Sequence, residues 1–335
     1  MERQTAILVA VQLAVVMSIA AALLMYLLRF RRNRIDIGRK SVLVANCDTV
    51  TGLACALRLH QLGFRVFAAC SDTESAVAKE LKAEKSGRMH VLHIDTKNGE
   101  VMLNAVDYVE QHIMPDEKGL WAIVNTPCTC VSGLFEWLTW SQCEEQVSEN
   151  LLATLRITKS FIHLLRSCQG RFINVLSFGG QTNYPGFSVY AATKAAIEAF
   201  TTSLQMELSP HLVRTVTVTP TANYDTYALS LSSPELAEDM WRTMTPDSKR
   251  TYMNEFRAFC QRMKSPALKS NTKVLAALVA DVEEAILCRS PAESYISGPL
   301  SAKMHLAALN LLPNEWKKQR LIKNFHRNFL SEKIV

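Results

Sequence analysis

Residues 188–194 read Ser-Val-Tyr-Ala-Ala-Thr-Lys, and their spacing carries most of the information about the fold and chemistry of this chain. A separation of four residues places Tyr190 and Lys194 on one face of a helix, which we expect to continue through Glu207. An ammonium beside a phenol favours the phenolate and lowers its pKa from about 10 towards neutral pH. The hydroxyl of Ser177, upstream of this helix, can hold a substrate oxygen near the phenol. These groups suit proton transfer to or from an alcohol or a carbonyl.

The segments around this helix predict a parallel sheet. Residues 171–177, Arg-Phe-Ile-Asn-Val-Leu-Ser, indicate a buried strand that ends in a serine, and residues 178–180, Phe-Gly-Gly, indicate a turn. Near the start of the chain, a strand, a helix at 52–62 and a second strand form a βαβ opening. These two strands are residues 41–45 and 66–70, and further strands are expected at residues 91–94, 122–125 and 215–219. The predicted fold is α/β, a doubly wound, Rossmann-like parallel sheet in a single domain, with ligands at the carboxyl ends of the strands.

The amino-terminal region predicts a membrane anchor. After a tail at 1–5, residues 6–28 are almost entirely apolar, long enough to cross a hydrocarbon core of about 30 Å as a transmembrane helix. A basic linker follows at 29–40, so the positive-inside rule predicts a single-pass protein whose domain at 41–315 faces the cytosol. A cleaved signal peptide is the alternative, but the apolar run exceeds the usual core of about 7–15 residues.

Composition, charge and cysteine content limit the number of domains, the partners and the metal sites that the chain can have. The chain has 335 residues, 48% of them hydrophobic, which suffices for one large core, and its net charge of +6 is concentrated at the two ends. The basic tail at 316–335 suits an anionic membrane surface, and a solvated helix accounts for it equally well; no nucleic-acid partner is expected. The nine cysteines show no framework spacing, and Cys128-Thr129-Cys130 lacks a second pair, so we expect no metal site.

The order of strand, serine, loop and Tyr/Lys helix resembles the active-site segment of the short-chain dehydrogenase/reductase family. Asn150 stands where that family has a helix asparagine, and Asp95 matches its acid after the third strand. With residues 42–48, 63–70 and 295–313, these motifs resemble the branch containing membrane-bound retinol dehydrogenases, 17β-hydroxysteroid dehydrogenases and 3-hydroxybutyrate dehydrogenase. The resemblance extends over about residues 40 to 315, and this branch implies the endoplasmic reticulum membrane.

The resemblance implies roles for the residues that match. Tyr190 would exchange a proton with the substrate, while Lys194 would assist it and bind the nicotinamide ribose. Ser177 would orient the substrate, and Asn150 would hold a water-linked proton relay. The resemblance also implies pairing into a homodimer through the helix that carries Tyr190. The expected cofactor contacts are Asn46, Asp48, Val50, Gly52, Cys70, Asp72, Asp95, Asn125, Tyr190, Lys194 and Pro220.

The chain departs from the family pattern along the cofactor. Residues 45–52 match Thr-Gly-x-x-x-Gly-x-Gly at the last glycine alone, with Asn46 and Val50 in place of the others. Asparagine tolerates positive φ, whereas a β-branched side chain does not and would stand where the pyrophosphate must approach. Pro127 alters the Asn-Asn-Ala-Gly motif, and Thr221 replaces the glycine after Pro220.

The choice of cofactor is encoded after the second strand. Cys70 occupies the position where many NAD-dependent relatives have an acid, and Asp72 is close enough to approach the ribose 2′-hydroxyl. This stretch has no cation to pair with a 2′-phosphate, and Asp48 and Asp72 would repel one, so NAD(H) is favoured over NADP(H). A helix cap before Glu74 is the alternative role for Asp72.

Two functions of different class follow. One is an oxidoreductase that interconverts an alcohol and a carbonyl on a lipophilic steroid, sterol or retinoid, with a variable substrate region at about 222–270. The departures from the glycine motif also resemble insect steroidogenic dehydrogenases, which implies a role in ecdysteroid synthesis. The other is a catalytically inactive member that binds a lipid or acts as a scaffold and keeps the fold without the cofactor.

Overall fold

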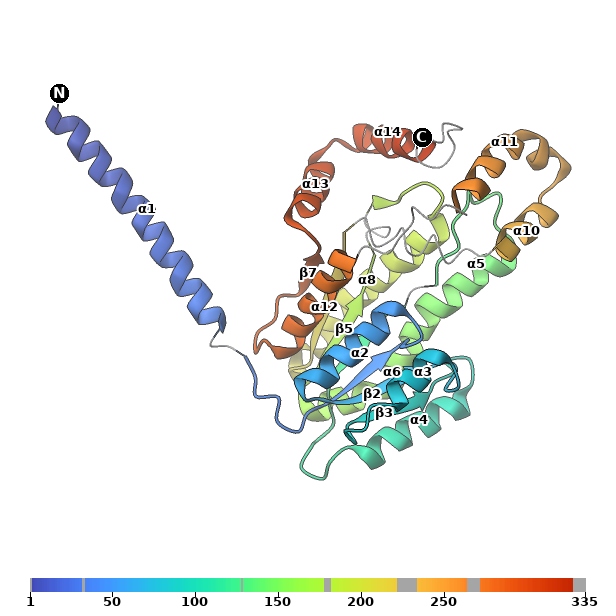
Figure 1. The fold of residues 1–335 in the computed structure, drawn as a ribbon, viewed down its shortest axis with the longest axis horizontal. Coiled ribbons are helices and arrows are strands. Elements are labelled where there is room, and N and C mark those ends of the chain that lie inside the picture. Colours follow the sequence, from blue (N-terminus) through green and yellow to red (C-terminus); the bar gives the residue numbers. More distant parts are fainter. Residues whose placement is uncertain are drawn as a thin grey trace.

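The computed structural model describes residues 2–31, 34–127, 129–177, 182–221, 234–263 and 272–327. At its centre is a seven-stranded sheet in which every neighbouring pair is parallel, in the order β3-β2-β1-β4-β5-β6-β7 (Figure 1). The strands are β1 (Ser41–Ala45), β2 (Arg65–Cys70), β3 (Met89–His93), β4 (Leu120–Asn125), β5 (Arg171–Val175), β6 (Arg214–Pro220) and β7 (Ser294–Ser297). This order confirms the predicted doubly wound, Rossmann-like sheet.

Helices cover both faces of the sheet. The described helices are α1 (Glu2–Arg31), α2 (Val50–Leu62), α3 (Ala76–Lys82), α4 (Gly99–His112), α5 (Trp140–Gln146), the π-helix η1 (Val147–Leu152), α6 (Ala153–Cys168), α8 (Ser188–Leu208), the 3₁₀-helix η2 (Ser209–His211), α10 (Pro234–Thr243), α11 (Pro246–Met263), α12 (Thr272–Leu287), α13 (Leu300–Leu311) and α14 (Asn314–Phe325). Buried side chains of α2, α3 and α12 pack on one face, and those of α4, α6 and α8 on the other.

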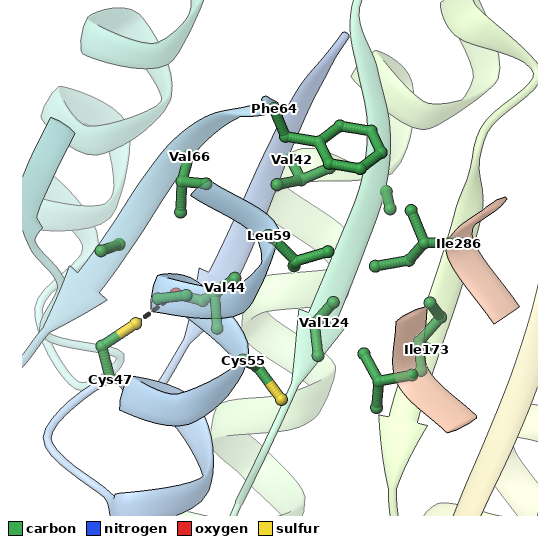
Figure 2. Close-up of a cluster of buried hydrophobic side chains, with 14 of the residues drawn as sticks. Val42, Val44, Cys47, Cys55, Leu59, Phe64, Val66, Val124, Ile173 and Ile286 are labelled. Atoms are coloured by element: carbon green, nitrogen blue, oxygen red, sulfur yellow. Dashed lines mark hydrogen bonds between the residues drawn. The ribbon is translucent and has the colours of Figure 1, made fainter. Parts of the chain in front are cut away.

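The two faces of the sheet form separate apolar cores. Because side chains alternate along a strand, Val42 and Val44 of β1 point to the face covered by α2, and Leu43 points to the opposite face. Figure 2 shows the first core, where Leu59 of α2 packs among valines of the central strands. In the same view Cys47 donates from its Sγ to the carbonyl of Val44. Strands buried on both faces explain why the sequence predicts them as short continuous apolar runs.

A third cluster, hereafter the aromatic cluster, lies at the carboxyl end of the sheet. It joins the loop after β4, the start of α8, and helices α10, α11 and α14, which gather at one end of the molecule (Figure 1). Trp137 is fully buried at its centre, with its ring edge-on to Phe256 and Phe259. Its buried members are Cys130, Val131, Trp137, Phe187, Tyr190, Met240, Met244, Phe256, Phe259 and Phe325. Helix α14 therefore contributes Phe325 to the same cluster as Tyr190.

The predicted single-pass anchor at residues 6–28 is wrong, and so is the placement in the endoplasmic reticulum facing the cytosol that depended on it. Among the parts of the chain that the structure describes, no helix has the length and apolar character needed to cross a membrane. Residues 6–28 lie in α1, which runs from Glu2 to Arg31.

Arg171 ties α12 to the sheet at the opposite end from the aromatic cluster. It is 2% exposed, and its guanidinium lies 4.2 Å from the ring centroid of Trp121. Its Nη1 donates to the carbonyls of Ala285 and Cys288, at 2.7 and 2.6 Å, where α12 ends. Burial is the main cause that lowers the pKa of Arg171, to about 10, so the side chain stays charged at neutral pH. A cation at a helix carboxyl terminus complements the helix dipole.

Arg171→Met is expected to lower the free energy of unfolding by about 2–3 kcal/mol. Two buried carbonyls lose their donor, and each unsatisfied buried group costs about 1–3 kcal/mol. Urea denaturation of the full chain measures the loss. Arg214→Met is the matched control, because Arg214 pairs with Arg171 in register on β6 but is exposed, and a change within about 0.5 kcal/mol is expected there. Equal losses in the two variants would contradict this role.

Candidate active site

A cavity opens where the strand order reverses between β1 and β4. It lies at the carboxyl ends of the first three strands and has a volume of about 360 Å³. Four of the residues expected from the sequence to contact the cofactor line it: Asn46, Asp48, Cys70 and Asp95. Open parallel sheets bind their ligands at such a reversal.

The degenerate glycine loop folds without the strain that its sequence suggests. Asn46 has a φ of +59°, which asparagine tolerates, and it is the one non-glycine residue of this loop with positive φ. Val50 is instead the first residue of α2 and is 38% exposed. The helix therefore begins two residues earlier than the expected Gly52. Thr49 caps it, because its Oγ1 accepts from the Gly52 amide at 3.0 Å.

Asp48 connects this loop to the end of β2. Its Oδ2 accepts from the amide of Ser71 at 2.6 Å and from the hydroxyl of the same residue at 3.0 Å. Burial, followed by the charge of Asp48, raises the pKa of the neighbouring Cys70 thiol to about 12. Cys70 is therefore a neutral thiol at physiological pH, and the acidic group at this end of the cavity comes from the loop.

The opposite rim of the cavity carries an ion pair. Lys97 follows Asp95 after β3, and its Nζ lies 2.7 Å from Oε1 of Glu149 in η1. Hydrogen bonding to Glu149 is the main cause that raises the pKa of Lys97. Asp95 itself is engaged in a turn, with Oδ1 accepting from the Lys97 amide at 2.8 Å. The charge of Lys97 is thus already paired with Glu149.

Tyr190 and Lys194 lie one turn apart on α8, and both are 1% exposed. The Nζ of Lys194 is 5.3 Å from the centroid of the Tyr190 ring, and the ring lies edge-on to Phe187 at 6.5 Å between centroids. Ser177 is also 1% exposed and follows β5 at the same end of the sheet. The structure thus places a phenol, an ammonium and a hydroxyl at one end of the sheet.

The loop after β4 is held by two of the predicted catalytic residues. Lys194 donates from Nζ to the carbonyl of Pro127. Asn150 accepts from the Thr129 amide at 3.0 Å and donates to the Thr129 carbonyl at 2.7 Å. It also donates to the hydroxyl of Thr193 at 3.2 Å. Asn150 lies in the π-helix η1, a distortion that often marks a functional position. We call the contacts that Lys194 and Asn150 make to Pro127 and Thr129 the loop clamp.

Seven of the eleven residues expected at the cofactor do not line the cavity: Val50, Gly52, Asp72, Asn125, Tyr190, Lys194 and Pro220. Asn125 is 1% exposed and donates to the side chains of Thr154 and Asn174 inside the protein, at 2.8 Å each. Asp72 accepts from the Glu74 amide at 2.8 Å in a local turn, and the helix cap that the sequence offered as its alternative role is taken by Ser75, whose side chain accepts from the Ala78 amide. Pro220 ends β6.

Thr221, which replaces a family glycine, is accommodated by a glycine on the neighbouring segment. The Thr221 amide donates to the Ser297 carbonyl at 2.8 Å. Gly298 has a φ of +148°, and a Cβ built on it would lie 2.1 Å from Oγ1 of Thr221. The space that the threonine side chain needs is therefore provided by Gly298.

Sequence reasoning missed several residues of the cavity. Ser71, Lys97, Thr129 and Glu149 all line it. Ser71, Lys97 and Glu149 are adjacent or close to the predicted positions Cys70, Asp95 and Asn150. A search of the sequence neighbours of those positions therefore finds them. The predicted turn at 178–180, Cys128, and the segments 222–233 and 264–270 of the predicted substrate region lie outside the described residues.

Comparisons with known proteins agree with this fold. A family model described as short chain dehydrogenase matches residues 40–232. The chain is similar to estradiol 17-beta-dehydrogenase 2 of Mus musculus, with 30% identity over 300 residues that cover 85% of this chain and 75% of that enzyme. It is 34% identical to the mitochondrial D-beta-hydroxybutyrate dehydrogenase of Mus musculus over 223 residues, covering 65% of this chain and 64% of that one. A short-chain dehydrogenase crystal structure from Streptomyces avermitilis shares the fold, with a TM-score of 0.59 and 21% identity over 84% of this chain and 97% of that chain.

Proposed function

This chain belongs to the short-chain dehydrogenase family, and we propose that it interconverts a secondary or allylic alcohol and a carbonyl on a lipophilic substrate, with NAD(H) as the preferred cofactor. The observation that supports this best is the grouping of Tyr190, Lys194 and Ser177 at the carboxyl end of the sheet. A phenol, an ammonium and a hydroxyl there are the groups that proton transfer to a substrate oxygen requires.

In the proposed reaction, the Tyr190 hydroxyl exchanges a proton with the substrate oxygen. Lys194, whose Nζ lies 5.3 Å from the centroid of the Tyr190 ring, stabilises the ionised phenol by its charge. Ser177 hydrogen-bonds the same substrate oxygen and orients it. Asn150 positions the loop beside these groups through its two bonds to Thr129. The nicotinamide, when bound, supplies or accepts the hydride.

The described residues fit a dinucleotide best at its adenosine half. The cavity of about 360 Å³ presents the carboxylates of Asp48 and Asp95, and the amino terminus of α2 offers amide donors and the positive end of a dipole for the pyrophosphate. Val50 stands at that terminus with 38% of its surface exposed, so the pyrophosphate would pass over a valine side chain instead of a glycine. Lys194 and Tyr190 would face the nicotinamide ribose.

The surroundings of Tyr190 favour an apolar substrate. Tyr190 belongs to the aromatic cluster, together with Phe187, Met240 and Met244. The relative that acts on estradiol matches 85% of this chain. We therefore propose that the substrate is a steroid-like alcohol or ketone. Retinoids, and sterols that are precursors of ecdysteroids, are further candidates, because they too are lipophilic alcohols or carbonyl compounds.

Titration calorimetry and turnover with the full chain test this proposal together. We expect NAD(H) to bind, and we expect a steroid alcohol to be oxidised with matching formation of reduced nicotinamide. The substrate panel comprises estradiol, retinol, an ecdysteroid precursor and D-3-hydroxybutyrate, the last as a small polar comparison. Preferential turnover of D-3-hydroxybutyrate would reject a lipophilic substrate.

The second candidate function is a cofactor-free lipid-binding or scaffold protein. It is favoured by Val50 at the start of α2 and by the bond that Lys194 makes to the Pro127 carbonyl. Absence of binding by NAD(H) and by NADP(H) at millimolar concentration, with steroid binding retained, would replace the oxidoreductase with this function.

A further inference from the structure

Another cavity lies at the amino ends of the central strands, at the opposite end of the sheet from the one that suits the cofactor. It has a volume of about 380 Å³, and its lining includes Trp121 of β4 and Arg171, the first residue of β5. The linker before β1 runs past the end of α12 here, where the Ile35 amide donates to the Leu287 carbonyl at 2.8 Å. The rest of the lining is Ile35, Asp36, Lys40 and Arg289. We call this the basic cavity.

The basic cavity carries an excess of positive charge. Three cations, Lys40, Arg171 and Arg289, stand against one acid, Asp36, which leaves a net charge of +2. None of the three cations forms a salt bridge within the described parts of the chain. The acid is already engaged in a turn, because its Oδ1 accepts from the Gly38 amide at 3.2 Å. An anion is therefore the ligand that the charges of this lining favour.

The indole of Trp121 holds two of the cations near each other. The Nζ of Lys40 lies 4.6 Å from its ring centroid, and the Cζ of Arg171 lies 4.2 Å from it. Arg171 is 2% exposed, and a buried arginine is usually paired with an acid. Burial, followed by the charge of Arg214, lowers the pKa of Arg171 to about 10. The carbonyls at the end of α12 satisfy its Nη1, but they carry no full charge that would balance the group of cations.

We propose that the basic cavity binds a phosphate monoester, whose charge of about −2 matches the excess of its lining. Guanidinium groups suit phosphate oxygens because they donate two parallel hydrogen bonds, and an ammonium adds a compact charge. Arg289 is exposed and Lys40 half-buried, so these two side chains can reach a ligand from the linker and from the end of α12. Arg171 contributes its charge from the buried side. The site is separate from the catalytic end of the sheet and does not depend on the proposed reaction.

Calorimetry of the full chain with glycerol 3-phosphate at low ionic strength tests the proposal. We expect saturable binding, and a melting temperature that rises with ligand concentration. Arg289→Gln and Lys40→Gln should each weaken the affinity about 10-fold, because each removes a charged hydrogen-bond donor. Asp36→Asn should strengthen the affinity about 2- to 5-fold, because it removes the one negative charge of the lining. Opposite effects of the two kinds of variant are not expected from a loss of structure.

Lys159→Gln is the control for the loss of one positive charge, because Lys159 is exposed on α6, which packs on the other face of the sheet. Its affinity should equal that of the unaltered chain. An equal loss in this variant, unchanged affinity in Arg289→Gln and Lys40→Gln, or weaker binding by Asp36→Asn overturns the proposal.

Dihexanoyl phosphatidic acid, a short-chain lipid with the same phosphate monoester, is the second probe. Tighter binding of this lipid, with the same dependence on Arg289 and Lys40, identifies a lipid headgroup as the source of the phosphate. Equal or weaker binding identifies a free metabolite. Absence of binding by both probes at millimolar concentration overturns the proposal. Melting temperatures of the ligand-free variants identify any that fails to fold.

Discussion

Tyr190→Phe is expected to lower kcat by about 10²- to 10⁴-fold, the range that a positioned acid or base contributes. The substitution removes the hydroxyl alone, because phenylalanine keeps the ring that packs edge-on against Phe187 and under the charge of Lys194. Dinucleotide affinity should change by less than about twofold, since the cavity lining at Asp48 and Asp95 is unaltered. Steady-state kinetics and calorimetry on the same preparation separate the two effects.

Tyr108→Phe provides a matched loss of one phenolic hydroxyl away from the site. Tyr108 lies on α4, where its ring stacks on His112 at 3.9 Å between centroids. Its kcat should equal that of the unaltered chain. If Tyr190→Phe retains turnover within about fivefold, Tyr190 is not the proton donor. If it loses the cofactor together with turnover, the hydroxyl supports structure and not chemistry.

Gly52→Ala should destabilise the protein by about 3 kcal/mol and abolish dinucleotide binding. A Cβ on Gly52 would lie 2.2 Å from the Asn46 carbonyl oxygen and 2.9 Å from the Cys47 Cα, both of them backbone atoms. Relief requires moving either α2 or the loop after β1, and both are packed into the core beneath them. Urea denaturation gives the stability loss, and calorimetry gives the loss of binding.

Gly99→Ala is the matched control for Gly52→Ala. Gly99 is the first residue of α4, and a Cβ on it would meet nothing within 4 Å. Alanine is the better helix former there, so we expect a gain of about 0.5 kcal/mol. If Gly52→Ala loses no stability, as expected for Gly99→Ala, the close approach of α2 to the loop does not constrain this site.

The sheet was predictable because its strands are continuous apolar runs that end in polar residues. Residues 41–45 and 122–125 were predicted within one or two residues of the observed β1 and β4. β7 was missed because Ser294–Ser297 is short, half exposed and lies at an edge, so its residues show no apolar run. Tyr190 and Lys194 were found from their spacing, which a helix converts directly into proximity.

Other features depend on contacts that local sequence does not encode. The two bonds from Ser71 to Asp48 join residues that are distant in the chain, and they require β1 and β2 to pair in the observed register. Asn125 was expected at the cofactor because of its position in a motif, whereas its amide group fits an interior network with Thr154 and Asn174. The strain expected at Val50 did not arise because the cap at Thr49 brings that residue into a helix.

The loop clamp gives two of the four predicted catalytic residues a structural role that does not depend on catalysis. Lys194 and Asn150 hydrogen-bond the backbone at Pro127 and Thr129. A catalytically inactive protein would therefore still need both residues to keep the structure of this loop. The presence of Lys194 and Asn150 is thus not by itself evidence for catalysis. The Tyr190 hydroxyl differs, because it can be removed while the ring keeps its packing. Within this site, the phenolic oxygen of Tyr190 is therefore the atom whose role distinguishes an active enzyme from an inactive protein that keeps the fold.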